Sequence, residues 1–353
     1  MSQETVSSLL TRIQKITQSQ NKAKRYTLYP IADDEAYKYY KKQEAAIWNA
    51  NELEFVTDKN HYNMLPENQK HIIKIIYAYF ASADGIIVQN LVFRFLVDCE
   101  NFEETAFYIT QLYIELVHSD VYSLTINTLI DDTEERARLF NAIDEMDCVK
   151  RKAEWMEKYM CADLPISYRR LAFACAEGIF FQSPFLGIFW FRTRGVLPNV
   201  IFTNEQVSKD EGLHTDFALN RLRRDKALGR EMPSPEFAYK MISEAVEIEK
   251  EFLDSFLPEA IDDFTPEYGE RFIELIGNYL SVDAGYEAMY DVQVEDLPSW
   301  IQEIANQQKG NFYEVRIGNY KQSSLKNAVD WKSRTEAKEN KASGYDDPLS
   351  VSF

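Results

Sequence analysis

Two Glu-x-x-His pairs constrain the fold of this chain more than any other feature of its sequence. One pair lies in "QLYIELVHSDVYS" and the other in "NEQVSKDEGLHTDF", two segments whose apolar residues recur at helical spacing. Glu115, His118 and Tyr122 fall at i, i+3 and i+7 and therefore share one helical face, as do Glu211 and His214. The whole chain has only four histidines. A single pair is a weak signal, whereas two pairs on separate helices indicate one shared site.

Two acidic residues on other predicted helices raise the question of what compensates their charge. Asp84 lies on an apolar stripe within "IIKIIYAYFASADGIIVQNL", and Glu177 is the only acid in "LAFACAEGIFFQSPFLGIFWF". An ionised carboxylate that is buried without a partner is costly. The alternative interpretation pairs each acid with an arginine or lysine from another helix.

A dinuclear metal site accounts for the acids and the pairs together. In one type of four-helix bundle, an acid from each of two helices and a Glu-x-x-His pair from each of the other two point at the same two metal ions. Four carboxylates then balance two divalent cations, and an oxygen-rich set with two imidazoles favours iron or manganese over zinc. We therefore predict six metal ligands: Asp84, Glu115, His118, Glu177, Glu211 and His214.

Helical periodicity also dominates the rest of the chain. Only 12 glycines and 11 prolines interrupt 353 residues, and we find no alternating strand pattern and no internal repeat. We expect residues 1–27 to form a polar N-terminal segment, residues 28–320 one all-α domain, and residues 321–353 a flexible polar tail. Long helices are predicted at about 67–97, 102–130, 165–192, 203–226, 234–257 and 265–290.

The bulk properties exclude several classes of protein. A net charge of -18 argues against a nucleic-acid-binding surface, which needs a basic footprint. The most apolar stretch, "IIVQNLVFRFLV", is interrupted by polar residues and is shorter than the roughly 20 residues of a membrane span. The N-terminus lacks the apolar region of a signal peptide. Four cysteines without a CxxC pattern favour a reduced, cytoplasmic compartment.

Tyr122 distinguishes among the reactions that such bundles perform, which include iron storage, monooxygenation, desaturation and radical generation. It follows His118 by one helical turn, and its expected neighbours are Phe181, Phe185 and Val207, at helical spacing from the predicted ligands. An apolar pocket of this kind would protect a phenol from water and reductants. The alternative interpretation is a core tyrosine that is hydrogen-bonded to a metal ligand.

Several segments resemble the small, radical-generating subunit of class I ribonucleotide reductase, in the style of eukaryotic and viral members. They are "EAAIWNANELEF", "YFASADGI", "ELVHSDVYS", "CAEGIFFQSPF" and "RGVLPNVIFTNEQVSKDEGLHTDF", and the match runs from about residue 28 to 320. The resemblance implies a ferritin-like helical bundle with two iron ions, or manganese, at the six positions above. It further implies that the reduced metals react with dioxygen and that Tyr122 then loses an electron and a proton. The stored tyrosyl radical is relayed to a large subunit, which reduces ribonucleotides to deoxyribonucleotides.

The resemblance also implies a radical relay. Its members are Trp48 and Asp210, with His118 linking Asp210 to the metal. In the tail, Tyr320 in "RIGNYKQ" matches the family context, so we favour it as the last relay residue. Tyr345 in "SGYDDPLSVSF" competes by its proximity to the C-terminus.

The expected partners follow from the same resemblance. Small subunits of this family form homodimers and dock on the large subunit through their C-terminal residues, here with apolar Leu349 and Phe353.

Two substitutions near the site depart from the family pattern. Lys209 replaces the usual arginine and lacks its planar fork, and Val207 replaces a common isoleucine.

Three alternatives remain open from the residues. A di-metal oxidase or oxygenase acting on a bound small molecule would not need the relay from Trp48 to a tail tyrosine. A non-catalytic partner subunit typically lacks metal ligands, and all six are present here. An iron-storage protein would be shorter and would need no docking tail.

Overall fold

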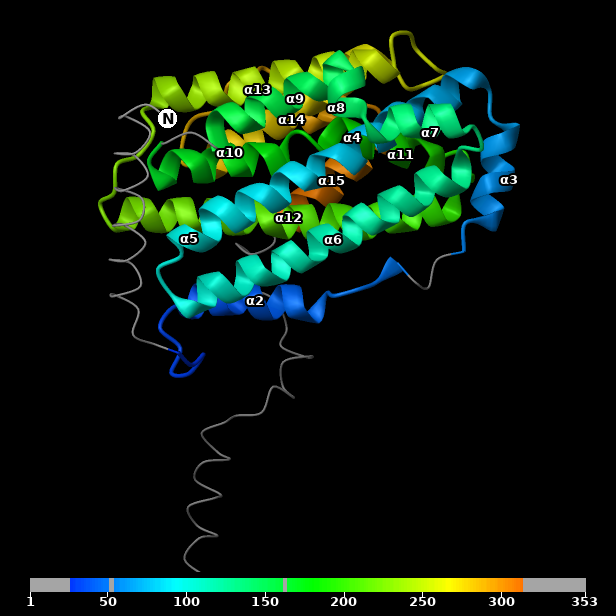
Figure 1. Cartoon of the computed structure of the whole chain (residues 1–353). Helices are drawn as coiled ribbons and strands as arrows, with labels where there is room; N and C mark the ends of the chain where they lie inside the picture. The colour runs from blue at the N-terminus through cyan, green and yellow to red at the C-terminus, as the bar shows by residue number, and fades with distance from the viewer. Residues whose placement is uncertain (1–25, 51–53, 161–163, 314–353) are drawn as a thin grey trace, which may run out of the picture. The chain divides into compact units, whose positions relative to one another are not determined.

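Apolar-striped segments of the chain form helices that pack on one another, and Figure 1 shows their order along the chain. The computed structural model describes residues 26–50, 54–160 and 164–313. Within these ranges it contains helices and no strand, so the predicted all-α fold is confirmed. The elements are α2 (Asp34–Ala45), α3 (Val56–Met64), α4 (Glu67–Asn90), the π-helix η2 (Leu91–Phe95), α5 (Leu96–Asp98), α6 (Phe102–Leu129), α7 (Thr133–Phe140), α8 (Ala142–Glu145), α9 (Asp147–Met160), α10 (Ile166–Gly178), α11 (Gln182–Arg192), α12 (Pro198–Ala227), α13 (Pro235–Phe256), α14 (Pro266–Asp283), the 3₁₀-helix η3 (Val294–Asp296) and α15 (Ser299–Tyr313).

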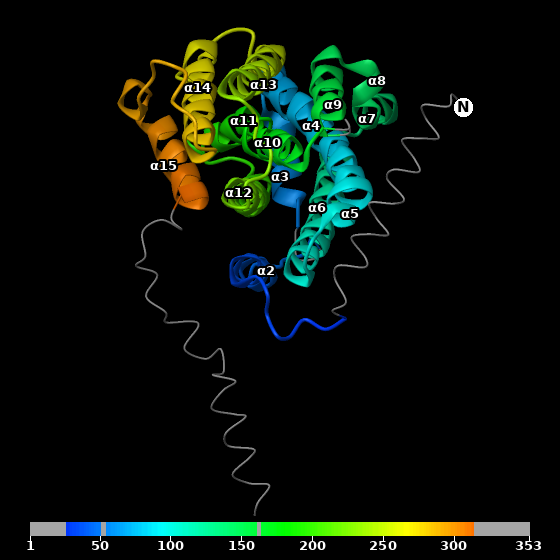
Figure 2. The same ribbon diagram turned by 90° about the vertical axis from the view of Figure 1, so that its left-hand side faces the viewer.

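Four of these helices form the inner bundle. α4 packs along α6, α10 packs along α12, and α12 also contacts α6. α13 lies against α10, α11 and α14, while α2 lies beside α6 and α12 (Figure 2). All of these helices belong to one compact unit. The predicted domain end at residue 320 and the predicted tail fall outside the described residues.

Three predicted helix spans are wrong. The helix expected over 265–290 ends at Asp283. The sequence predicts a continuous helix over 165–192, but α10 ends at Gly178 and α11 begins at Gln182. The helix expected from residue 203 begins instead at Pro198, whose missing N–H costs nothing at the first position.

A buried ion pair between Lys152 and Glu249 stabilises the break between α10 and α11. The Lys152 ammonium donates to the Phe180 carbonyl at 2.7 Å and lies 2.6 Å from Glu249 Oε2. Glu249 Oε1 accepts hydrogen bonds from Ser183 N at 2.8 Å and Ser183 Oγ at 2.6 Å. Backbone groups that a continuous helix would pair are therefore satisfied by side chains from α9 and α13.

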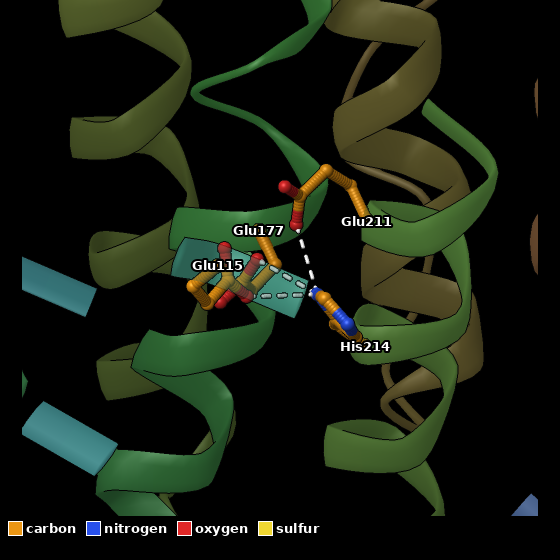
Figure 3. A group of neighbouring side chains, drawn as sticks. All are labelled: Glu115, Glu177, Glu211 and His214. Atoms are coloured by element: carbon orange, nitrogen blue, oxygen red, sulfur yellow. Dashed lines mark hydrogen bonds and ion pairs between the residues drawn. The ribbon is translucent and has the colours of Figure 1, made fainter. Parts of the chain in front are cut away.

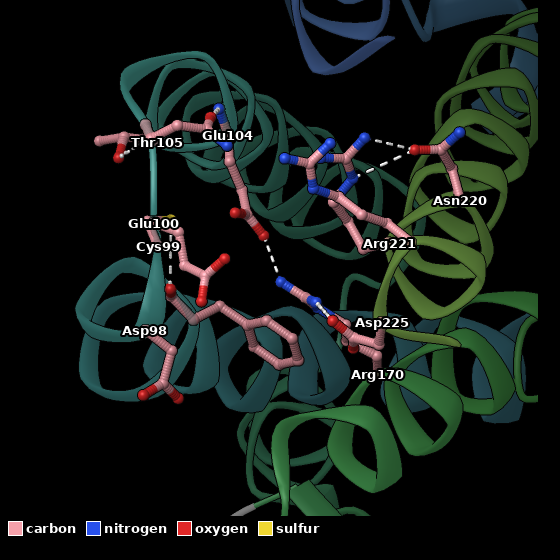
Figure 4. A network of polar contacts seen from close by, with 12 residues as sticks. Asp98, Cys99, Glu100, Glu104, Thr105, Arg170, Asn220, Arg221 and Asp225 are labelled. Atoms are coloured by element: carbon pink, nitrogen blue, oxygen red, sulfur yellow. Dashed lines mark hydrogen bonds and ion pairs between the residues drawn. The ribbon is translucent and has the colours of Figure 1, made fainter. Parts of the chain in front are cut away.

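A buried charge network joins α6, α10 and α12 at one end of the bundle (Figure 4). Arg170 pairs with Glu104 and, at 2.5 Å, with Asp225. Asp225 also lies 2.7 Å from Arg230 Nη1. Each of these helices also carries a predicted metal ligand, so the network fixes their relative positions.

Two helical stretches are long and apolar enough to cross a membrane by length and composition alone. They span Glu67–Asp98 and Ile166–Thr193, and 56% and 100% of their most apolar windows are buried inside the protein. Buried core helices meet the same criteria, so these spans are weak evidence for a membrane segment.

The start of α12 depends on α3. The residue before α12, Leu197, has a left-handed backbone (φ 57°) and provides no side-chain cap. Its N–H donates instead to His61 Nδ1 at 3.0 Å. Asp58 Oδ1 accepts from the N–H groups of Asn199 at 3.0 Å and Val200 at 2.9 Å. A carboxylate from another helix thus replaces the local cap and suits the positive end of the α12 dipole.

We predict that Asp58→Ala lowers the free energy of unfolding by about 1–3 kcal/mol, because it leaves buried N–H groups unsatisfied. Chemical denaturation would measure the change. Asp144→Ala, which removes an exposed aspartate from a helical first turn, is the control and should have little effect. Equal stability of the two variants would contradict this assignment.

Candidate metal centre

The six predicted ligands come from the four inner helices. Asp84 lies on α4, Glu115 and His118 on α6, Glu177 in the last turn of α10, and Glu211 and His214 on α12. All six side chains are fully buried. Figure 3 shows how Glu115, Glu177, Glu211 and His214 converge from three helices.

The six residues form two overlapping groups. Candidate donor atoms of Glu115, Glu177, Glu211 and His214 lie within 4.8 Å of one another, and so do those of Asp84, Glu115 and His118. Glu115 belongs to both groups. The arrangement therefore offers two neighbouring cation positions that share at least one carboxylate.

Glu115 and Glu211 connect the two positions. His118 Nδ1 lies 3.4 Å from Glu115 Oε2 and 3.2 Å from Glu211 Oε1. His214 Nδ1 lies 3.1 Å from the other oxygen of each glutamate, Glu115 Oε1 and Glu211 Oε2. Each glutamate thus directs one oxygen toward each imidazole, as a bridging ligand of two metals does.

The electrostatics of the cluster require compensating positive charge. Burial raises the pKa of Asp84 and of Glu177 well above the ordinary range, and neighbouring carboxylates add to the shift. Burial by itself lowers the pKa of His118 and of His214, but the surrounding carboxylates outweigh it and hold both well above the ordinary value. These shifts show how strongly the buried charges repel like charge and attract protons or metal ions.

Unsatisfied atoms mark where cations fit. Both oxygens of Asp84, one oxygen each of Glu115, Glu177 and Glu211, and Nδ1 of His118 are buried without a hydrogen-bond partner among the described residues. Carboxylate oxygens and imidazole nitrogens are donors that iron and manganese accept. The residues present therefore fit two divalent metal ions.

Two glutamines that were not predicted from the sequence support the ligands. The Gln111 side-chain amide donates to Glu115 Oε1 at 3.2 Å and to Glu177 Oε1 at 3.3 Å. Gln43 Nε2, on α2, lies 2.7 Å from His214 Nε2. Groups of this kind orient metal ligands. Gln111 precedes Glu115 by one turn and could have been found from spacing, whereas nothing in the sequence places Gln43 near His214.

Tyr122 lies beside the cluster in a buried aromatic pocket. Its hydroxyl is buried without a hydrogen-bond partner in the described part of the chain. Burial, followed by the charge of Asp84, raises its pKa well above 10. The ring stacks on Phe80, with centroids 4.6 Å apart, and lies 5.9 Å from Tyr77 and 6.3 Å from His118.

Two of the predicted pocket residues pack on Phe80, which itself stacks on Tyr122. Phe181 and Phe185 contact Phe80 at centroid distances of 5.8 Å and 5.7 Å. Val207 is fully buried. Phe80 itself was not predicted to belong to the pocket, because periodicity does not reveal which ring of a stripe faces another helix.

A hydrogen-bonded chain leads from the cluster toward the surface. Asp210 Oδ2 accepts from Trp48 Nε1 at 2.8 Å and lies 3.1 Å from His118 Nε2. Trp48 is half-buried, and Lys209 is exposed. Tyr320, Tyr345, Leu349 and Phe353 lie outside the described residues.

Comparisons with known proteins agree on one family. A family-wide sequence profile described as "Ribonucleotide reductase, small chain" matches residues 25–298. The protein is 36% identical over 313 residues to the ribonucleoside-diphosphate reductase small chain of Nicotiana tabacum, covering 88% of this sequence and 93% of that relative. It is 37% identical over 306 residues to the small chain of vaccinia virus (strain Ankara), covering 87% and 94%.

A solved structure gives the same result. The ribonucleotide reductase Rnr4 homodimer from Saccharomyces cerevisiae superposes with a TM-score of 0.71 at 26% identity, covering 87% of this protein and 99% of the yeast protein.

We predict that His118→Ala or His214→Ala reduces bound metal well below two ions per chain, because each removes the only imidazole of one position. Metal analysis after anaerobic Fe(II) loading would measure this. His71→Ala is the matched control, since His71 is exposed and its imidazole bonds to the Ser255 carbonyl, at 2.9 Å, rather than to a predicted ligand. Two retained ions in either site variant would remove that histidine from the ligand set.

Proposed function

The chain belongs to the family of ribonucleotide reductase small chains, and we propose that it stores a tyrosyl radical on Tyr122. As the small subunit of a ribonucleoside-diphosphate reductase, it is part of an oxidoreductase. The observation that supports the radical most directly is the position of Tyr122. Its buried hydroxyl faces no hydrogen-bond partner among the described residues, and its ring lies beside the His118 end of the carboxylate cluster.

Two iron ions, or two manganese ions, are the proposed cofactors. Asp84, Glu115 and His118 would hold one ion, and Glu177, Glu211 and His214 the other, with Glu115 and Glu211 shared. When bound, the metal pair supplies a one-electron oxidation, for which dioxygen is the ultimate oxidant. Tyr122 would lose one electron to the oxidised centre and its hydroxyl proton toward the carboxylates. The surrounding rings exclude water from the radical.

The relay toward the large subunit would pass through Trp48. Asp210 uses one oxygen for both Trp48 and His118, which connects a half-buried indole to the metal position by two hydrogen bonds. A di-metal oxidase acting on a bound small molecule would have no use for such a chain. Tyr320 would extend the relay beyond the described residues.

The outer face of α6 supports a homodimer. Ile109, Tyr113 and Leu116 fall at i, i+4 and i+7 and are 54%, 48% and 55% exposed. A stripe of large exposed apolar side chains is typical of an interaction site. A second copy of the protein would cover it in an isologous contact, consistent with the homodimer formed by the yeast relative.

We predict that Ile109→Glu combined with Leu116→Glu converts the dimer to a 41.2-kDa monomer, because it places charge in the contact. Light scattering at micromolar concentration would measure the mass. Val282→Glu is the control, since Val282 is exposed by 46% on α14. A dimer that persists in the double variant would place the contact elsewhere.

Tyr122→Phe should retain two metal ions and react with dioxygen but form no stable tyrosyl radical, because it loses only the phenolic O–H. Electron paramagnetic resonance after Fe(II) loading and exposure to air would test this. Tyr113→Phe, an exposed tyrosine on the same helix, should keep the full signal. An undiminished tyrosyl signal in Tyr122→Phe would place the radical on another residue.

Deletion of residues 346–353 should abolish nucleotide reduction with an added large subunit while leaving metal content and the Tyr122 radical intact. The reason is loss of the docking residues Leu349 and Phe353. Tyr320→Phe should also stop reduction, but without loss of large-subunit binding in a pull-down assay. If Tyr345→Phe rather than Tyr320→Phe stops turnover, Tyr345 is the relay residue.

A further inference from the structure

Three buried tyrosines surround one phenylalanine next to the metal cluster. Phe80 contacts Tyr122 at a centroid distance of 4.6 Å, Tyr77 at 5.8 Å and Tyr79 at 6.1 Å. All three phenols are almost completely excluded from solvent. Tyr77 accepts a hydrogen bond from Asn204 Nδ2 at 2.9 Å, whereas the hydroxyls of Tyr122 and Tyr79 have no hydrogen-bond partner within the described ranges. Burial and hydrogen bonding of the hydroxyl therefore do not decide between Tyr122 and Tyr79 as the residue that is oxidised.

A buried ammonium group distinguishes these two phenols. Lys152 Nζ lies 3.8 Å from the centroid of the Tyr79 ring and 3.7 Å from that of Phe252. In the described part of the chain, the contacts between cationic side chains and aromatic rings include Tyr79 but neither Tyr122 nor Tyr77. Glu249 keeps the ammonium in place at 2.6 Å, and both side chains are completely buried.

The partner carboxylate is itself fixed. Glu249 Oε1 accepts two hydrogen bonds from Ser183, at the start of α11. The charge recorded over the face of the Tyr79 ring is the ammonium, 3.8 Å from the ring centroid. Burying an ion pair rarely adds stability over well-packed apolar side chains, so the bridging of the helix break need not be the only role of Lys152.

We propose that Lys152 confines the oxidising equivalent to Tyr122 by making Tyr79 difficult to oxidise. The inference rests on the proposed function, because it presumes a metal centre that accepts an electron from a tyrosine. Forming a Tyr79 radical would transfer one electron from its ring to the oxidised metal pair and one proton from its hydroxyl to an acceptor. The ammonium opposes the first step, since a ring that loses an electron no longer attracts a cation. The second step does not distinguish the two phenols, since neither the Tyr79 nor the Tyr122 hydroxyl has a hydrogen-bond partner among the described residues.

The effect is large enough to determine where the radical resides. Loss of a desolvated cation–ring contact corresponds to roughly a 30-fold change in the distribution between two sites, or about 2 kcal/mol. Lys152 therefore acts as a positioning residue: it touches neither the metal ligands' donor atoms nor Tyr122, and it acts through Tyr79.

The test combines Lys152→Met with Glu249→Gln, which removes both charges together and leaves no unpaired buried ion. The variant is loaded with Fe(II), exposed to air and frozen for electron paramagnetic resonance, with metal content and circular dichroism as checks of integrity. We expect the wild-type protein to show the Tyr122 signal. In the double variant, the ratio of Tyr79 radical to Tyr122 radical should rise roughly 30-fold, so that a second tyrosyl signal becomes visible. Adding Tyr79→Phe should remove the second signal. Lys152→Arg, which keeps the positive charge, should retain the single wild-type signal.

A double variant with two bound metals and only the Tyr122 signal would overturn the inference, as would a second signal that survives Tyr79→Phe. A further measurement leaves Lys152 untouched. In Tyr122→Phe, any transient radical trapped by rapid freezing should be unchanged by adding Tyr79→Phe. A transient that disappears would show that Tyr79 is oxidised despite Lys152, and would also overturn the inference. Absence of any tyrosyl radical in the metal-loaded wild-type protein would instead contradict the proposed function itself.

Discussion

The burial of four carboxylates and two imidazoles in one cluster is the constraint on which the rest of the structure depends. Such a cluster is unfavourable in an apolar interior unless cations or protons balance it. The backbone N–H and C=O groups around the cluster are buried as well and need hydrogen-bond partners. Helices satisfy most of these groups internally and bring ligands inward at i, i+3 spacing. The four inner helices must then be held in register, and several buried polar contacts contribute to that.

Buried ion pairs and caps hold the ligand helices from several directions. Arg170 joins α6, α10 and α12 through Glu104 and Asp225. Asp58 fixes the start of α12. The pair of Lys152 and Glu249 bridges the break that follows the turn carrying Glu177. Each interaction satisfies backbone or charged groups that burial would otherwise leave unpaired, so stability and ligand geometry depend on the same contacts.

The same constraint on buried polar groups extends to the proposed radical site around Tyr122. The environment of Tyr122 and Tyr79 has a low dielectric constant, because it consists of aromatic rings in contact and hydroxyls without partners among the described residues. In such an environment a single charge, here the ammonium beside Tyr79, has a large effect. The path to the surface is polar by contrast, since Asp210 serves both His118 and Trp48. The proposed storage of the radical and its proposed relay would thus use opposite environments.

The sequence by itself determined the helical class, the two Glu-x-x-His faces and the isolated acids Asp84 and Glu177. It could do so because helical spacing shows which side chains share a face, and because a buried charge requires a compensating partner wherever it occurs. It did not predict the break after Gly178, the support of His214 by Gln43, the stacking of Phe80 on Tyr122, or the ammonium of Lys152 over Tyr79. Each of these depends on which helices meet and at what register. Only the tertiary structure decides this, because contacts between distant segments leave no periodic trace in either one.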